Sequence, residues 1–333
     1  SLSIEDMIAE EEMVLTITHN GYIKRTSLST YRSQRRGGRG VQGASSREED
    51  FVEHLFVANT HSYILFFTDK GKCYWVKVYD IPEGGRAAKG RAIVNLIGCE
   101  PDEKVSAFIS VKEFHEDHFV VMATEKGIVK KTKLSAYSNP RKKGIYAVEI
   151  RDGDKLIEAR VSTGDNDILL GTRNGKSIRF SEEQIRASGR KTMGVKGITL
   201  SSDDDRLVGM LLIKREGTVL VATEKGFGKR TEISQYRAQK RGGKGVLTMK
   251  TTEKVGKMVT IKEVVEKDDL MIITNQGVLI RLPVAQIRSI GRATQGVKLI
   301  KLGEGTLVSS ITRIMSEEEQ DEDNNSEPSS DKE

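Results

Sequence analysis

The chain has 333 residues, of which 31% are charged and only 5% are aromatic, and its formal net charge at pH 7 is +6. That length exceeds what one simple hydrophobic core usually supports, so it predicts two domains or one repeat architecture. No apolar run is long enough to span a bilayer and no signal peptide opens the chain, so we expect a soluble protein. Cys73 and Cys99 lie far apart, without a CxxC or Cys/His cluster, so neither a zinc site nor a disulfide framework is expected, and a reduced, cytoplasmic setting fits best.

Charge is segregated toward the end of the chain. Residues 316–333 contain nine acidic residues against Lys332 and almost no apolar ones, so we expect a disordered acidic tail. Removing its net charge of −8 from +6 leaves +14 on residues 1–315. At the start, residues 4–13 are acidic and predict a short helix, and we interpret residues 1–13 as a linker from an upstream domain.

A short motif recurs six times along the chain. An apolar run ends in Thr and is followed by two polar residues and a glycine, at intervals of 48 to 56 residues. Each copy is typical of a strand that closes on a tight hairpin turn, where glycine supplies a positive φ. The six turn glycines are Gly21, Gly71, Gly127, Gly175, Gly226 and Gly277.

The units stay in register beyond the turn. The tenth residue after the glycine alternates between Tyr and Ile, and each unit continues through a Gly-rich loop to a third strand, an acidic turn and a fourth strand. No helical pattern of useful length interrupts residues 14–315. Four-stranded units at a period near 50 residues predict an all-β, propeller-like ring, and we assign these repeated positions a structural role.

The Gly-rich loops hold the positive charge. A second glycine falls 19 residues after the first in five units and 17 after it in the third. Nine-residue windows around these glycines, 34–42, 84–92, 138–146, 188–196, 239–247 and 290–298, contain 17 cations and no acids, where random choice predicts about eight acids. The candidate DNA contacts among them are Arg35, Arg36, Arg39, Arg86, Lys89, Arg91, Arg141, Lys142, Lys143, Arg190, Lys191, Lys196, Lys240, Arg241, Lys244, Arg292 and Lys298.

Equal offsets place these loops at the same edge of every blade, which predicts a basic belt around the ring. Such a belt attracts a polyanion by counterion release, and its glycines would let the backbone approach phosphates closely. The windows contain no pattern that reads bases, so binding should depend on phosphate contacts and DNA bendability. The alternative, a solvated charged rim, would normally mix both signs.

The first window is more specific. Its residues resemble the seven-residue box that marks the C-terminal DNA-wrapping domain of the A subunit of bacterial DNA gyrase, which is a type IIA topoisomerase: Gln34, Arg35, Arg36, Gly37, Gly38, Arg39 and Gly40. The box lies in the first unit, as in that family, and the segment from Glu11 to Arg25 is also similar. The resemblance covers residues 4–315 and implies that 14–315 form a six-bladed β-pinwheel, a propeller whose neighbouring blades exchange strands.

The resemblance also implies a function and partners. Double-stranded DNA would wrap with positive handedness around the perimeter, presenting a segment for passage so that gyrase introduces negative supercoils. The domain would be non-catalytic and hold no metal or cofactor, whereas ATP and Mg²⁺ would serve other parts of an A2B2 heterotetramer formed with the gyrase B protein. The upstream breakage-reunion domain of the same chain would be a further partner, in the bacterial cytoplasm at the nucleoid, with no membrane.

Two features complicate this interpretation. Trp75 stands where the other five units have Arg or Lys, and we expect it in the core or between blades because a lone aromatic cannot form a stacking platform. The fifth unit repeats the box almost completely and could share its role, through Gln239, Lys240, Arg241, Gly242, Gly243, Lys244 and Gly245.

Three alternatives remain. The equivalent domain of topoisomerase IV wraps DNA less tightly and lacks the complete box, so the intact motif favours gyrase. A protein-interaction propeller of the WD40 or kelch kind is disfavoured because no WD dipeptide occurs and the double glycines lie in basic loops. An enzyme is disfavoured because no P-loop is present and the histidines are scattered; the cluster His115, Asp117 and His118 is expected in an exposed loop between strands.

Overall fold

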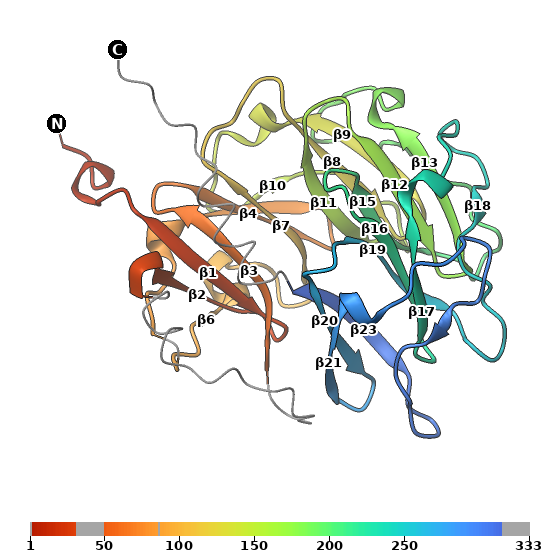
Figure 1. The fold of residues 1–333 in the computed structure, drawn as a ribbon. Coiled ribbons are helices and arrows are strands. Elements are labelled where there is room, and N and C mark those ends of the chain that lie inside the picture. The colour runs from red at the N-terminus through yellow and green to blue at the C-terminus, as the bar shows by residue number, and fades with distance from the viewer. Residues whose placement is uncertain (1, 31–49, 86, 315–333) are drawn as a thin grey trace, which may run out of the picture.

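Six small antiparallel sheets follow one another around a ring (Figure 1). The computed structural model describes residues 2–30, 50–85 and 87–314. Within these residues five sheets have four strands and the sixth has three. The sheets follow the chain order, from red through green to blue in Figure 1, and β23 of the last sheet lies beside β3 of the first. The predicted six-bladed, nearly all-β propeller is confirmed.

Each blade is built on the hairpin that the repeat predicts. The turn glycines all have positive φ, from 77° at Gly277 to 89° at Gly127, which L-residues with side chains rarely adopt. The hairpins are β1 (Glu12–Thr18) with β2 (Tyr22–Ser27), β4 (Tyr63–Thr68) with β5 (Lys72–Lys77), β8 (Phe119–Thr124) with β9 (Ile128–Lys133), β12 (Asp167–Thr172) with β13 (Lys176–Ser181), β16 (Thr218–Thr223) with β17 (Phe227–Glu232), and β20 (Asp269–Thr274) with β21 (Leu279–Pro283).

A third strand pairs with the first strand of each hairpin and lies toward the ring axis. Every one of these pairings has a bulge beside the Thr that ends the hairpin's first strand. Neighbouring inner strands contact each other around the ring. They are β3 (Val52–Asn59), β7 (Val105–Val111), β11 (Leu156–Ser162), β15 (Leu207–Leu212), β19 (Met258–Val264) and β23 (Val308–Ile314).

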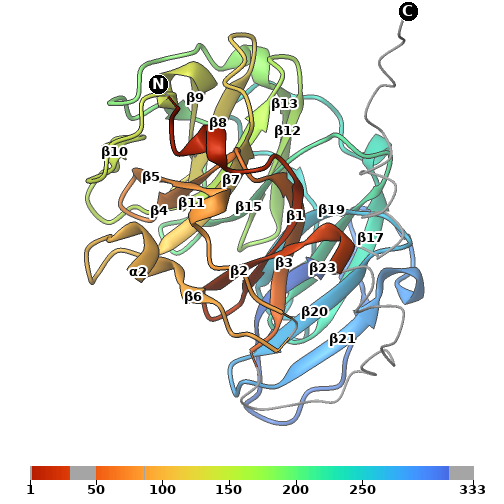
Figure 2. The same cartoon turned by 90° about the vertical axis from the view of Figure 1, so that its left-hand side faces the viewer.

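The outermost strand of a blade comes from the next unit. For example, β6 follows the second hairpin in sequence but pairs with β2 of the first blade, as Figure 2 shows. This exchange, which the family resemblance implies, is present in five blades; the matching segment of the first unit lies outside the described residues. The exchanged strands are β6 (Arg91–Ala92), β10 (Ile145–Tyr146), β14 (Val195–Lys196), β18 (Val246–Leu247) and β22 (Val297–Lys298).

Helical structure in the described chain is short. One turn of 3-10 helix follows the second strand of five hairpins, and a five-residue α-helix follows β6. No helix in the described ranges is long and apolar enough to cross a membrane. These elements are η1 (Glu5–Met7), η2 (Val78–Asp80), α2 (Ile93–Ile97), η3 (Leu134–Tyr137), η4 (Glu182–Gln184), η5 (Ile233–Gln235) and η6 (Val284–Gln286).

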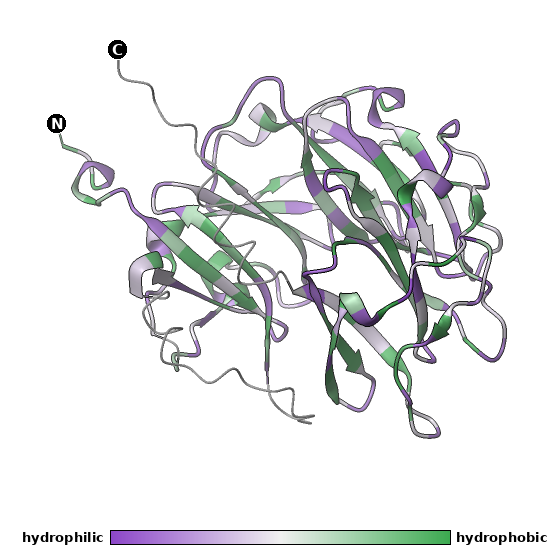
Figure 3. Cartoon of the chain, viewed as in Figure 1, coloured by the Kyte–Doolittle hydropathy of each residue, from purple (hydrophilic) through white to green (hydrophobic). Residues whose placement is uncertain are grey.

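The hydrophobic core consists of layers between consecutive blades. Side chains of alternate parity enter different layers: Ile64 and Phe66 of β4 pack toward the first blade, whereas Leu65 and Phe67 pack toward the third. Figure 3 accordingly shows hydrophobic colour concentrated on the strands and hydrophilic colour on the loops. Each such buried side chain contributes about 1.5–3 kcal/mol. Thin layers of this kind explain how a chain with few aromatic residues folds at this length.

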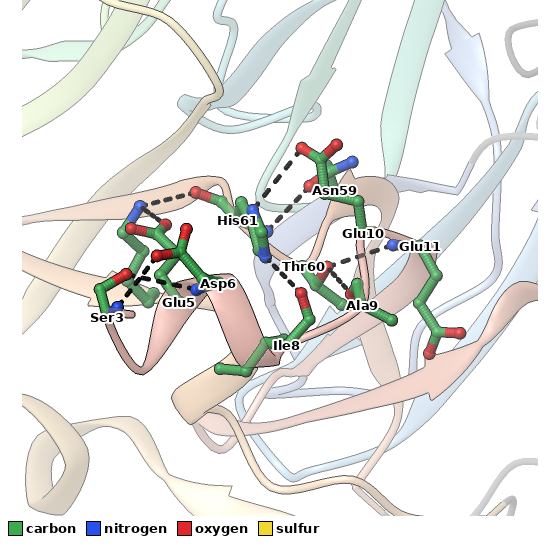
Figure 4. A network of polar contacts seen from close by, with 11 residues as sticks. Ser3, Glu5, Asp6, Ile8, Ala9, Glu10, Glu11, Asn59, Thr60 and His61 are labelled. Carbon is green, nitrogen blue, oxygen red and sulfur yellow. Dashed lines mark hydrogen bonds and ion pairs between the residues drawn. The ribbon is translucent and has the colours of Figure 1, made fainter. Parts of the chain in front are cut away.

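The segment before β1 contains the predicted short helix only as a single turn. Only Glu5–Met7 form a helical turn, and the backbone is then held in extended form by the β3–β4 turn (Figure 4). Thr60 Oγ1 donates to the carbonyl of Ala9 at 2.8 Å, and His61 Nε2 lies 2.9 Å from the carbonyl of Ile8. These contacts occupy carbonyls that a longer helix would use internally, and β1 begins at Glu12.

Candidate nucleic-acid interface

The second glycine of the second to sixth units, where the structure describes it, lets the loop dock on the preceding blade. At Gly245 φ is +74°, and an added Cβ would lie 2.2 Å from the carbonyl oxygen of Ser177. At Gly194 the corresponding distance, to the carbonyl of Val129, is 2.3 Å. These glycines are therefore explained by strand exchange between blades, and nothing further is required of them in phosphate contact.

Most of the predicted cations in the described loops project into solvent. These residues lie on the exchanged strands or in the loops just before them, and the exchanged strands are the outermost strands of five consecutive blades. Ten are exposed: Lys89, Arg91, Arg141, Lys142, Lys143, Lys191, Lys196, Lys240, Lys244 and Lys298. Residues 34–40, which form the box, and Arg86 lie outside the described residues.

Three of the predicted contacts are half-buried arginines that also bind backbone. The Arg190 guanidinium donates to the carbonyl of Tyr146 at 3.1 Å, and that of Arg241 donates to the carbonyl of Lys196 at 2.6 Å. Arg292 makes the equivalent bond to Leu247. Each arginine thus ties its loop to the exchanged strand of the preceding unit, so its role is partly structural and only its remaining N–H groups are available to a phosphate.

The near copy of the box in the fifth unit is well defined. Gly242, with φ +86°, donates its N–H to the carbonyl of Gly197 at 2.9 Å. The carbonyls of Gly242 and Gly243 accept from the hydroxyl and N–H of Thr199, at 2.6 and 2.8 Å. The double glycine therefore packs its backbone against the fourth unit, while Lys240 and Lys244 remain exposed.

Three exposed arginines lie just outside the nine-residue windows and were therefore not predicted as DNA contacts. Arg186, Arg237 and Arg288 each lie 11 residues after the hairpin glycine, in the stretch between the 3-10 turn and the Gly-rich loop. The repeat could have revealed them, because the same offset holds Arg in three consecutive units; the windows began two residues too late. They are three more exposed cations in the segments that lead into the Gly-rich loops of the fourth, fifth and sixth units.

The basic position four residues after the hairpin glycine lies between blades. Arg179 Nη1 donates to the carbonyl of Tyr236 at 3.0 Å, at the end of the next blade's 3-10 turn. Trp75 Nε1 makes the equivalent bond to Tyr137 at 2.8 Å. The indole N–H thus takes the place of an arginine donor, which confirms the expected position of Trp75 between blades.

Two further polar clusters lie outside the basic loops. His115 and His118 lie in the loop between β7 and β8 with ring centroids 4.9 Å apart, as expected. A cavity of about 1110 Å³ at the ring axis is lined by charged groups that partly satisfy one another, such as Arg160 and Glu158 at 3.3 Å. Burial lowers the pKa of His54 in this cavity to about 4. No group of three His, Cys, Asp or Glu placed to hold a metal occurs in the described ranges.

The fold and the rim together define a six-bladed propeller of the strand-exchanged kind with a basic perimeter. The sequence identifies the family within this class. The chain belongs to the family described as "DNA gyrase C-terminal domain, beta-propeller". The family model matches residues 12–59, 62–112, 118–163, 166–214, 217–264 and 268–314. Each matched segment is one predicted unit, and the resemblance inferred from residues 34–40 is confirmed.

Similar proteins agree with this placement. The chain is 47% identical over 331 residues to the A subunit of DNA gyrase from Staphylococcus aureus (strain MRSA252), a match that covers 98% of this chain and 37% of that protein. It is 47% identical over 321 residues to the A subunit of DNA gyrase from Staphylococcus epidermidis (strain ATCC 12228 / FDA PCI 1200), covering 96% and 36%. The chain therefore spans little more than a third of the length of these relatives.

Two solved structures share the fold. A crystal structure of the C-terminal domain of DNA topoisomerase IV superposes with a TM-score of 0.82 at 25% identity, covering 95% of this chain and 97% of that one. A structure of the DNA gyrase A C-terminal domain superposes with a TM-score of 0.70 at 22% identity, covering 92% and 100%. At the latter identity the likeness concerns the fold alone.

Proposed function

We propose that this domain binds double-stranded DNA along its rim without reading sequence, and bends the DNA around the ring. The observation that supports this best is the row of ten exposed cations on consecutive exchanged strands and loops. Phosphates pair with such cations and release condensed counterions. Within the described residues α-helix occurs at 28–30 and in α2, and α2, with five residues, is too short to read a major groove.

Wrapping requires a continuous contact surface. Bending duplex DNA through about half a turn over a few tens of base pairs costs on the order of 10 kcal/mol, which many phosphate contacts must offset. The arginine ties from Arg190, Arg241 and Arg292 keep neighbouring loops at fixed spacing and so support simultaneous contacts.

In the whole protein we propose that this domain serves DNA gyrase as part of the gyrase A protein. It would present a wrapped segment to the upstream breakage-reunion domain and give supercoiling its negative direction. The gyrase B protein, ATP and Mg²⁺ would act elsewhere in an A2B2 enzyme of the bacterial cytoplasm, and this domain would carry no catalytic residue.

The test is a ligation assay. A nicked plasmid is sealed in the presence of the domain, the protein is removed, and the topoisomers are resolved. A shift of linking number that grows with protein concentration, with the sign of a positive wrap, is expected. Tight binding without a shift would favour a straight DNA contact, a small shift would favour the topoisomerase IV type of domain, and no binding would favour a protein-interaction propeller.

A further inference from the structure

Alternate units carry a lysine that the basic windows do not include. Three residues after the hairpin glycine stand Lys24, Lys130 and Lys229 in the first, third and fifth units, each followed by a basic residue and Thr. The even units have Tyr74, Ile178 and Ile280 at this position. The ring thus has two kinds of junction between consecutive units.

Lys229 lies beneath the loop of the sixth unit and is fully buried. Its Nζ donates to the carbonyls of Gly291 and Thr294, each at 3.0 Å, and to the carbonyl of Arg292. The Thr294 hydroxyl is also 3.0 Å away. Thr231 extends this contact by donating to the carbonyl of Ile290 at 3.0 Å. One side chain therefore binds three carbonyl groups of this basic loop.

The other two lysines repeat this arrangement. Lys130, which is 1% exposed, donates to the carbonyl of Arg190 in the fourth unit's loop and to the carbonyl of Ala147 in its own unit, both at 2.7 Å. Half-buried Lys24 donates to the carbonyls of Gly85 and Ala88 in the second unit, both at 2.9 Å. The loops of the second, fourth and sixth units are thus each bound by a lysine of the preceding blade.

These lysines are costly core residues. Burial, with Arg292 and Lys250 nearby, lowers the pKa of Lys229 to about 8, and burial with Arg190 nearby lowers the pKa of Lys130 to about 7. Within the described residues neither Lys130 nor Lys229 has a carboxylate partner at ion-pair distance. Isoleucine fills the same position in the fourth and sixth units without a buried cation, so packing alone does not call for lysine.

We propose that Lys24, Lys130 and Lys229 are positioning residues for DNA binding. Each holds one or more carbonyl oxygens of the next unit's loop inward, away from DNA, so that the loop's cations stay together on the rim. Since carbonyl dipoles directed inward leave their positive ends outward, the arrangement also makes the loop surface more favourable to phosphate. This inference rests on the proposed function.

The test compares two neighbouring buried lysines of β9. Lys130→Met removes the contact with Arg190, whereas the matched control Lys131→Met removes a buried contact with Glu182, 3.5 Å away, that does not involve the loop. DNA affinity is measured against salt concentration, and amide hydrogen exchange is measured for residues 188–194. For Lys130→Met we expect faster loop exchange and a log–log salt slope shallower by about two, since the loop contributes three cations and each phosphate contact adds about 0.9.

For Lys131→Met we expect a lower melting temperature with an unchanged salt slope. Lys24→Met is the second variant, because its half-buried site tolerates the change better; the same two effects are expected, with exchange measured at residues 84–90. If wild type binds DNA with a steep slope and both Lys130→Met and Lys24→Met match it in slope and loop exchange, the inference is overturned. If wild type does not bind DNA, or if Lys191→Ala and Lys196→Ala leave its slope unchanged, the proposed function fails as well.

Discussion

The Arg241 guanidinium donates to the carbonyl oxygen of Lys196 at 2.6 Å, which joins the fifth unit's basic loop to the exchanged strand of the fourth unit. The same side chain donates through Nε to the carbonyl of Gln184 at 3.1 Å. A residue predicted to contact DNA is therefore also a clamp between blades. Because the clamp uses only part of the guanidinium, Arg241 can fix the loop spacing and still offer N–H groups to a phosphate.

Salt dependence is the first prediction. If roughly ten rim cations pair with phosphates, the log of the DNA affinity should fall against log salt concentration with a slope near −9, and affinity should drop about 10³–10⁵-fold between 50 and 200 mM. Fluorescence anisotropy on a short duplex at five salt concentrations measures this. A slope near −2 would exclude binding along the rim.

The three arginines that the windows missed give a second prediction. Arg186→Ala, Arg237→Ala and Arg288→Ala together should make the slope shallower by about three, because each exposed cation accounts for about one released counterion. Lys112→Ala, which removes an exposed cation at the end of the inner strand β7, is the matched control and should leave the slope unchanged. Equal effects of the triple variant and the control would show that these arginines do not face the DNA.

The architecture could be predicted from the sequence because each repeat unit encodes the strands and the turn of one blade. Six turn glycines, a period near 50 residues and four strands per unit were sufficient for a ring of blades. The short helix expected over residues 4–13 is present only as one turn at Glu5–Met7, because contacts from Thr60 and His61, distant in sequence, hold the residues after it in extended form.

At the site, the sequence identified the basic loops, but it did not show which of their residues are exposed to solvent and which bind the backbone of a neighbouring unit. Some arginines of the basic loops point into solvent, whereas others, such as Arg292, donate to a backbone carbonyl of the neighbouring unit. The sequence does not show which carbonyls of that unit lie within reach, so it could not separate the two groups. The buried lysines were missed for a related reason. From sequence alone Lys130 and Lys229 resemble charged surface residues, whereas in the structure the loop of the next unit covers them and they are buried. The sequence did contain one signal, because the even units have Tyr or Ile at the same position.

Stability should depend on pH through Lys130. Its pKa is lowered to about 7 in the folded protein, so between pH 7 and its ordinary value of 10.5 the unfolded chain holds a proton that the folded chain has released. The free energy of unfolding should therefore rise with pH in this window, by at most about 1.4 kcal/mol per pH unit. In the other direction, this gain in stability should be lost as pH falls from 10.5 toward 7, and it should be absent below the folded pKa of about 7.

The measurement is the difference in unfolding free energy between wild type and Lys130→Met, from urea titrations between pH 7 and 9. Above pH 9 the thiol of Cys73 would interfere, because burial raises its pKa in the folded state and only the unfolded chain ionises there. A difference that stays constant from pH 7 to 9 would show that Lys130 remains charged throughout, held by its two carbonyl partners.

The last prediction separates binding from wrapping, and it concerns the box, which lies outside the described residues. Replacing Arg35, Arg36 and Arg39 by Ala removes three of the 17 cations in the six windows, so simple association should weaken only modestly. Wrapping should fail, because a gap in the contacts lets bent DNA leave the rim before its bending energy, on the order of 10 kcal/mol, is offset. The ligation assay should show no shift of linking number, although anisotropy still reports binding.

The fifth unit supplies the matched control, since Lys240, Arg241 and Lys244 occupy the same places in a nearly identical motif. Removing them deletes equal charge, and in addition the clamp from Arg241 to Lys196. If the box is the anchor, this second triple variant should keep a measurable shift of linking number, and in the parent enzyme only the first should abolish supercoiling while sparing ATP-dependent relaxation. If the two variants behave alike, the anchor is shared between the units; if the first wraps and supercoils normally while the second does not, the fifth unit holds it.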